Sequence, residues 1–211
     1  MRLTFLGHAA FALEGGGVRL LLDPHMPGAV GGRFQLPEIQ GPFDAIAYTH
    51  PHQDHAGWTP AMGTTRLIDG PTTIGGIAVT ARTVLHDHHG GMQQGLVSML
   101  SYHVEGVRVV HCGDLNAWTD DDVAWLRGTD VLLVPCGGTY SLGGVEAARL
   151  VTAVAPRVSV PMHAADPRVR LDLEPIAHFL TALGQPHREA ALLDTADAGW
   201  DRTPVLVLDP P

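Results

Sequence analysis

The sequence contains no lysine, only two cysteines and no long uninterrupted apolar run. Its 13 basic residues are all arginines scattered along the chain, and 22 acidic residues bring the formal net charge to −9. Because nucleic-acid binding depends on clustered positive charge, no nucleic-acid partner is expected. No segment reaches the roughly 18 to 20 consecutive apolar residues of a membrane span, so we expect a soluble protein without a membrane partner.

The two cysteines, Cys112 and Cys136, each precede a glycine at the end of an apolar run. They could pair or bind metal, but buried free thiols are favoured, and these fit a reducing compartment. The apolar part of the N-terminus, residues 3–6, is too short for a secretory signal and is interrupted by Gly7 and His8. We therefore expect a cytoplasmic protein whose first residues form a strand.

The 211 residues contain no repeat and no low-complexity linker, which predicts a single domain over residues 1–211. The first half consists of strand patterns separated by glycine-rich turns, and the second half alternates strands with helices. The predicted strands are 2–6, 10–13, 18–23, 44–49, 76–85, 96–104, 107–112, 130–136, 157–163 and 204–209. The predicted helices are 121–128, 143–155 and 173–184. This order indicates an α/β protein with helices covering the outer faces of sheets.

Four polar residues follow apolar strands directly or closely: His50, His86, Asp114 and His163. Loops at strand ends are where layered α/β proteins gather their chemistry, because a rigid sheet holds these loops in place. We expect these four side chains to converge on one site.

The segment "THPHQDHAG" places three histidines and an aspartate within six residues. In an extended chain His50 and His52 point the same way, and Asp54 and His55 then face a neighbouring point. Imidazole and carboxylate groups are ordinary ligands of Zn²⁺ and, with more oxygen donors, of Mn²⁺ or Fe²⁺. A general base beside Asp54 would explain only one of the histidines, so a metal site is the favoured interpretation.

This segment resembles the HxHxDH signature of the metallo-β-lactamase fold superfamily, and a later His, Gly-Asp and His follow in that superfamily's order. The segments "FLGHAAFAL", "LLLDP", "VLHDHHGG", "VHCGD", "LLVPCGGTYS" and "PMHAA" look most like bacterial metal-dependent hydrolases related to ascorbate-6-phosphate lactonase. The resemblance implies an αββα four-layer sandwich of two mixed sheets flanked by helices, with a dinuclear metal centre along one edge.

The resemblance also implies a set of ligands for two divalent ions, zinc first, with manganese or iron as alternatives. His50, His52 and His86 would hold the first ion. Asp54, His55 and His163 would hold the second, and Asp114 would bridge them. Two ions roughly 3.5 to 4 Å apart would turn a water between them into a hydroxide near neutral pH, and this hydroxide would be the nucleophile.

The third ligand of the first ion has competitors, and the roles of His8 and Asp23 have alternatives. His88 and His89 compete with His86, which is favoured because it directly follows the strand 76–85 and because the similar hydrolases carry a His-Asp there. His8 would lie behind the ligands or bind substrate, or would only satisfy a strand end. Asp23 would orient a ligand histidine, or would only form the turn before a proline.

Tyr140, after the strand 130–136, is a candidate substrate contact, with packing as the alternative. Asp54 and Asp114 are the candidate catalytic residues, and Asp54 could also move protons. The remaining histidines are expected at the surface or in packing roles: His25, His103, His111, His178 and His187.

The predicted function is a dinuclear metal-dependent hydrolase that cleaves an ester-like bond of a small molecule: a lactone, thioester or phosphoester. A di-iron oxidoreductase on the same fold is one alternative, but those proteins resemble an HxExDx pattern with glutamate in place of His52, and they usually carry a flavin domain. A non-catalytic metal-binding protein is another, but it predicts damaged ligands, whereas all seven are intact. Assembly into a homo-oligomer is left open.

Overall fold

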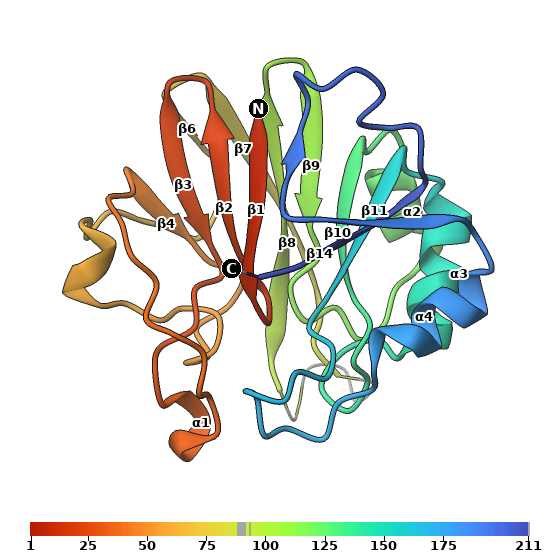
Figure 1. Ribbon diagram of the computed structural model, residues 1–211, viewed down its shortest axis with the longest axis horizontal. Helices are drawn as coiled ribbons and strands as arrows, with labels where there is room; N and C mark the ends of the chain where they lie inside the picture. Colours follow the sequence, from red (N-terminus) through yellow and green to blue (C-terminus); the bar gives the residue numbers. More distant parts are fainter. Residues whose placement is uncertain (88–91, 93, 211) are drawn as a thin grey trace.

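Two mixed β-sheets lie face to face, and helices cover the outer side of the larger sheet (Figure 1). The computed structural model describes residues 1–87, 92 and 94–210. The smaller sheet has the order β13-β1-β2-β3-β4-β5. Its strands are β1 (Arg2–Gly7), β2 (Ala10–Gly15), β3 (Val18–Leu22), β4 (Ala45–Ala47), β5 (Leu67–Ile68) and β13 (Leu193–Asp194).

The larger sheet has the order β12-β14-β11-β10-β9-β8-β7-β6. Its strands are β6 (Thr72–Ile74), β7 (Ile77–Leu85), β8 (Leu96–Val104), β9 (Val107–His111), β10 (Val131–Pro135), β11 (Val158–Met162), β12 (His187–Ala190) and β14 (Val205–Leu208). The helices are α1 (Ala29–Gly32), η1 (Pro60–Met62, a 3₁₀ turn), α2 (Asp120–Leu126), α3 (Gly144–Val154) and α4 (Ile176–Leu183).

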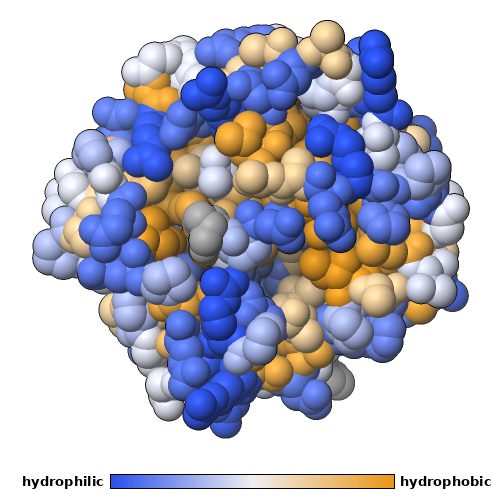
Figure 2. Space-filling model, viewed as in Figure 1, coloured by the Kyte–Doolittle hydropathy of each residue, from blue (hydrophilic) through white to orange (hydrophobic). Residues whose placement is uncertain are grey.

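Burial on both faces explains the continuous apolar runs of the larger sheet. In β10, Leu133 points into the core between the two sheets, whereas Leu132 and Val134 point into a second core under α2, α3 and α4. The outer face of the smaller sheet packs against Ile39 and other apolar residues of loop and 3₁₀ segments rather than against a long helix. On the face seen in Figure 2, hydrophilic side chains divide the remaining hydrophobic surface into several patches.

The direction of the strands places the candidate donors at one edge. Strands β9, β10 and β11 are parallel, and β7 runs the same way because β8 lies antiparallel to both β7 and β9. In the smaller sheet β3 and β4 are parallel. The carboxyl ends of these strands therefore open onto a common set of loops.

The predicted strands and helices are all present, and the two mixed sheets confirm the predicted α/β class. The chain also forms short elements that the sequence did not predict, among them β5, β12 and β13. Cys112 and Cys136 are buried free thiols, as expected. Within the described part of the chain, no helix combines the length and apolarity needed to cross a membrane.

Candidate metal centre

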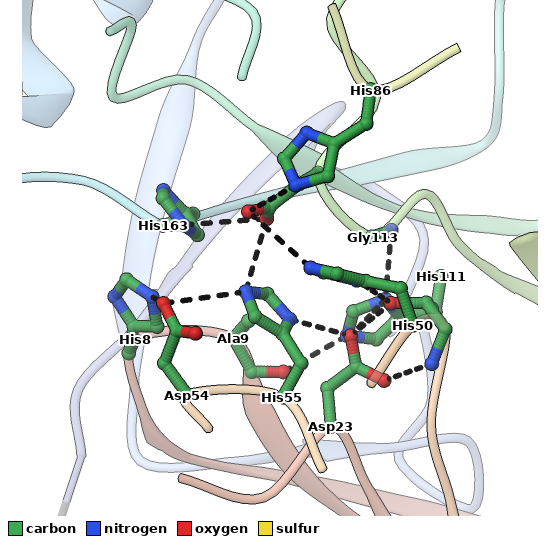
Figure 3. A network of polar contacts seen from close by, with 12 residues as sticks. His8, Ala9, Asp23, His50, Asp54, His55, His86, His111, Gly113 and His163 are labelled. Carbon is green, nitrogen blue, oxygen red and sulfur yellow. Dashed lines mark hydrogen bonds and ion pairs between the residues drawn. The ribbon is translucent and has the colours of Figure 1, made fainter. Parts of the chain in front are cut away.

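The predicted donors meet at the edge where the strands end, although they come from both sheets (Figure 3). His50 and His55 follow β4 of the smaller sheet, whereas His86, Asp114 and His163 follow β7, β9 and β11 of the larger sheet. All five side chains are buried. Residues more than 100 positions apart in sequence thus contribute to a single site.

Asp114 lies at the centre of the site and presents a different oxygen to each side. Its Oδ1 is 3.2 Å from His55 Nε2 and 3.3 Å from His163 Nε2. Its Oδ2 is 3.6 Å from His86 Nε2 and 3.9 Å from His50 Nε2. One carboxylate therefore faces two groups of histidines, which is the geometry expected of a bridging ligand.

Among the described residues, three groups of donors have ligand atoms within 4.8 Å of one another. In one of them, Asp23, His50 and His55, the Asp23 carboxylate already accepts a hydrogen bond from His55 Nδ1. The other two groups share no residue. We call one the pocket cluster, and it contains His50, His52 and His86. We call the other the inner cluster, and it contains His8, Asp54, His55 and His163.

The polar atoms of both clusters fit a bound cation. Nε2 of His50, His55, His86 and His163 is buried, as is Asp114 Oδ1, and none of these atoms has a hydrogen-bond partner. Leaving one such group buried and unpaired costs roughly 1–3 kcal/mol. Imidazole nitrogens and carboxylate oxygens that converge without partners are the donor set of Zn²⁺ and similar divalent ions.

Asp23 and Thr49 orient one histidine of each cluster. Asp23 Oδ2 accepts hydrogen bonds from His55 Nδ1, at 2.8 Å, and from the Thr49 hydroxyl, at 2.6 Å. Because the hydroxyl hydrogen goes to the carboxylate, Thr49 Oγ1 accepts from His50 Nδ1, at 3.0 Å. Both histidines then carry a proton on Nδ1 and direct Nε2 toward the site, as metal-binding histidines do. The predicted orienting position of Asp23 is present in the structure.

Most of the donors are expected to be unprotonated at neutral pH, because their pKa values are lowered. Burial lowers the pKa of His8 and of His50 to about 3. Burial alone would raise the pKa of the Asp114 carboxyl, but the charges of His163 and His55 outweigh it and hold that pKa well below its usual range. His55 is the exception: burial lowers its pKa, but neighbouring Asp114 and Asp23 raise it well above its ordinary value. A cation among these groups would replace the proton on His55.

The backbone is held in unusual conformations around the site. His8, Asp23 and His163 have positive φ angles of 57°, 42° and 53°, a region that non-glycine residues rarely occupy. Gly137 packs so closely on the end of β11 that a Cβ there would lie 2.0 Å from the His163 carbonyl oxygen. Strain of this kind concentrates at functional sites.

A cavity of about 170 Å³ opens onto the centre. From the centre it is lined by His52, His86, Asp54 and Asp114, and from the surrounding segments by Val30 of α1 and by Gln94, Tyr140 and Leu171. Tyr140 thus lines the cavity, and its role as a substrate contact stays a prediction. Val30, Gln94 and Leu171 were not predicted, because they lie in the short α1 and in loops without a recognisable motif. Thr49 was also missed, although it directly precedes the histidine-rich segment.

The structure also places His86, which the sequence left in competition with two neighbouring histidines, and His111, which was expected to have a packing role. His86 lies in the pocket cluster, whereas His88 and His89, its competitors, fall outside the described residues. His111 is fully buried behind the centre, where its Nε2 donates to the Ala9 carbonyl oxygen and its Nδ1 accepts from Gly113 N. Both ring nitrogens of His111 are therefore engaged in hydrogen bonds to the backbone.

Comparison with known proteins agrees with this architecture. A family model described as "Beta-lactamase superfamily domain" matches residues 2–163, a range that includes all seven predicted ligands. A UPF0173 metal-dependent hydrolase of Archaeoglobus fulgidus is 30% identical over 194 residues, covering 77% of this chain and 83% of the relative. A UPF0173 protein of Pyrococcus furiosus is 34% identical over 188 residues, with coverage of 77% and 83%.

A crystal structure from Thermotoga maritima superimposes with a TM-score of 0.76 at 29% identity, covering 98% of this chain and 97% of the other. That protein is described as a candidate zinc-dependent hydrolase of the metallo-β-lactamase superfamily. The fold and the relatives define the class, the metal-dependent hydrolases with two facing mixed sheets. The chain belongs to the β-lactamase superfamily.

Proposed function

We propose that the protein is a dinuclear zinc hydrolase that cleaves an ester-like bond of a small molecule, namely a lactone, thioester or phosphoester. The observation that carries this proposal is the position of Asp114, whose two oxygens face His55 and His163 on one side and His50 and His86 on the other. A single carboxylate placed in this way suits a bridge between two ions.

Bound metal ions would lower the pKa of water and polarise the oxygen of the scissile bond. The chain itself would hold the ions through the pocket cluster, the inner cluster and Asp114. Asp54 lines the cavity, where its carboxylate can accept a proton during hydrolysis. Burial would raise the pKa of Asp54, but the contact with His8 and the charge of His55 outweigh it and lower that pKa.

The cavity wall supplies substrate contacts. The Tyr140 hydroxyl can donate a hydrogen bond to an oxygen on which negative charge develops. Val30 and Leu171 contribute apolar surface that excludes water from the same cavity. Its volume of about 170 Å³ suits a small substrate rather than a polymer.

A substrate panel tests the proposal. The purified chain, loaded separately with Zn²⁺, Mn²⁺ and anaerobic Fe²⁺, is assayed against a lactone, a thioester and a phosphodiester. We expect metal-dependent hydrolysis of at least one class and its loss on chelation. Metal-loaded protein that hydrolyses none of the three would contradict the proposal.

Tyr140→Phe tests the substrate contact, with Tyr48→Phe as the matched control, since Tyr48 contacts Asp69 away from the cavity. Loss of one preorganised donor should lower kcat by about 10²-fold. The Tyr48 variant should keep wild-type kcat. Equal kcat in both variants would exclude Tyr140 from charge stabilisation.

A further inference from the structure

The inner cluster contains a donor that the ligand set inferred from the sequence lacks. His8 sits in the turn between β1 and β2, where the register shifts between Phe5 and Gly7. Gly7 and His8 both have positive φ, 106° and 57°. This turn directs the His8 ring into the interior, where the residue is 2% exposed.

Neither ring nitrogen of His8 has a hydrogen-bond partner, although both are buried. Its Nε2 lies 3.4 Å from Asp54 Oδ2 without forming a hydrogen bond. Two ligand atoms that each lie 2.0–2.1 Å from one tetrahedral zinc ion are separated by about 3.3–3.4 Å. The distance between His8 and Asp54 therefore matches two ligands of one ion.

The surroundings of His8 hold its ring among the other donors. Its ring centroid is 4.0 Å from that of His163 and 5.6 Å from that of His55. The Phe34 ring packs edge-on against it at 4.8 Å, and the His8 carbonyl oxygen accepts a hydrogen bond from His163 N at 2.7 Å. The ring and the backbone of His8 are thus fixed relative to His163.

The two clusters differ in their exposure to the cavity. His52 and His86 of the pocket cluster line it, whereas Asp54 is the only member of the inner cluster that does so among the described residues. Each additional protein ligand of a zinc ion leaves one position fewer for water or substrate. With the bridging Asp114 counted at both ions, the inner cluster offers five protein donors and the pocket cluster four.

We propose that His8 is a further protein ligand of the inner cluster, beside Asp54, His55, His163 and the bridging Asp114, so that this cluster retains its metal ion more tightly than the pocket cluster. The inference rests on the proposed function in requiring that both clusters bind metal. Substrate would then meet the ion of the pocket cluster, and the inner ion would mainly hold Asp54 and Asp114 in place.

Zinc retention tests the proposal without an activity assay. The full chain is loaded with two equivalents of Zn²⁺ and titrated with a competing chelator, while bound zinc is measured. We expect wild-type protein to lose zinc in two separate steps. In His8→Gln, whose amide keeps a polar side chain at this position but is a poor zinc ligand, the tighter step should weaken by more than about 100-fold, exceeding the effect of losing an outer partner.

His25→Gln is the matched control. His25 is also fully buried and also packs against Phe34, at 6.3 Å, but it lies outside both clusters. This variant should show the two wild-type steps. The proposal would be overturned if His8→Gln retained zinc as tightly as the wild type, or if the wild type lost its two zinc ions in steps of equal affinity. A wild-type chain that binds no zinc would instead overturn the proposed function itself.

A second measurement avoids variants altogether, in case His8→Gln does not fold. Wild-type protein labelled with nitrogen-15 histidine and loaded with cadmium-113 should show a one-bond coupling between the metal and a ring nitrogen of His8. Couplings to His55 and His163 without one to His8 would overturn the proposal.

Discussion

At the scale of single residues, one carboxylate serves both halves of the centre. Asp23 accepts directly from His55 of the inner cluster and, through the Thr49 hydroxyl, orients His50 of the pocket cluster. Thr49 N also donates to Asp23 Oδ1, at 2.7 Å, which fixes the carboxylate in place. The tautomers of two histidines thus depend on one buried aspartate.

The hydroxyl of Thr49 provides a test of this arrangement. Thr49→Val keeps the shape of the side chain but removes the group that accepts from His50 and donates to Asp23. Because outer partners of metal-binding histidines contribute about 10–100-fold to affinity, zinc affinity should fall by that factor. Competition with a fluorescent chelator measures it.

Thr49→Ser is the control for this change, since serine retains the hydroxyl. It should keep affinity close to that of the wild type. If the valine and serine variants bound zinc equally well, the Thr49 hydroxyl would have no part in orienting His50.

At the scale of elements, the strands that could be predicted from the sequence are those whose side chains are buried. Strands such as β7, β8 and β10 were predicted because their apolar residues alternate or run continuously. The edge strand β12 was missed because its sequence, HREA, carries no apolar pattern and is only half-buried. β13 has two residues and exists through its pairing with β1, which no local pattern encodes.

The cap of helix α2 gives a prediction at this scale. The Thr119 hydroxyl accepts from Asp122 N, and the Asp122 carboxylate accepts from Thr119 N, which forms a capping box. Thr119→Ala should lower the free energy of unfolding by about 1 kcal/mol, measured by urea denaturation. Thr152→Ala, at an exposed position inside α3, serves as the control and should cause no comparable loss.

The capping box of α2 also predicts that the stability of the fold depends on pH. Burial alone would raise the pKa of Asp122, but hydrogen bonds from Thr119 and Arg82 outweigh it and lower that pKa below 3.8. A carboxyl whose folded-state pKa is depressed stabilises the fold above its unfolded pKa and loses this contribution as the pH falls. The stability difference between wild type and Asp122→Asn should therefore be full at pH 6 and shrink below about pH 4. A difference that grew on acidification would contradict the assignment.

At the scale of the whole molecule, the metal centre joins the two sheets. His50 and His55 belong to the loop after β4 of the smaller sheet, whereas His86, Asp114 and His163 end strands of the larger sheet. An ion bound by donors from both sheets connects them across one edge. Metal binding is therefore expected to stabilise the fold as well as the site.

Thermal unfolding measures this stabilisation. Zinc at about 1,000 times its Kd adds about 4 kcal/mol to the stability of a one-site protein. For a chain of this size that corresponds to a rise in Tm of roughly 10 °C, and a chelator should reverse it. Zinc should raise the Tm of Asp114→Asn by less than that of the wild type. A wild-type Tm that did not change after chelation would contradict the idea that the bound ion stabilises the contact between the two sheets.

The sequence predicted the site better than its surroundings, for a physical reason. Regular spacing and strand ends indicated His50, His52 and Asp114, since donors of this type rarely gather by chance. The place of His8 beside Asp54 depends on a strained turn, and Val30 and Leu171 reach the cavity from loops. Such positions are decided by tertiary packing, which short sequence patterns do not contain.

Equilibrium dialysis of the apo protein against Zn²⁺, followed by elemental analysis of metal per chain at saturation, tests whether this chain binds two metal ions around Asp114. We expect two zinc ions per chain in the wild type and fewer than two in Asp114→Ala. Saturation at one ion or none in folded wild-type protein would contradict this expectation.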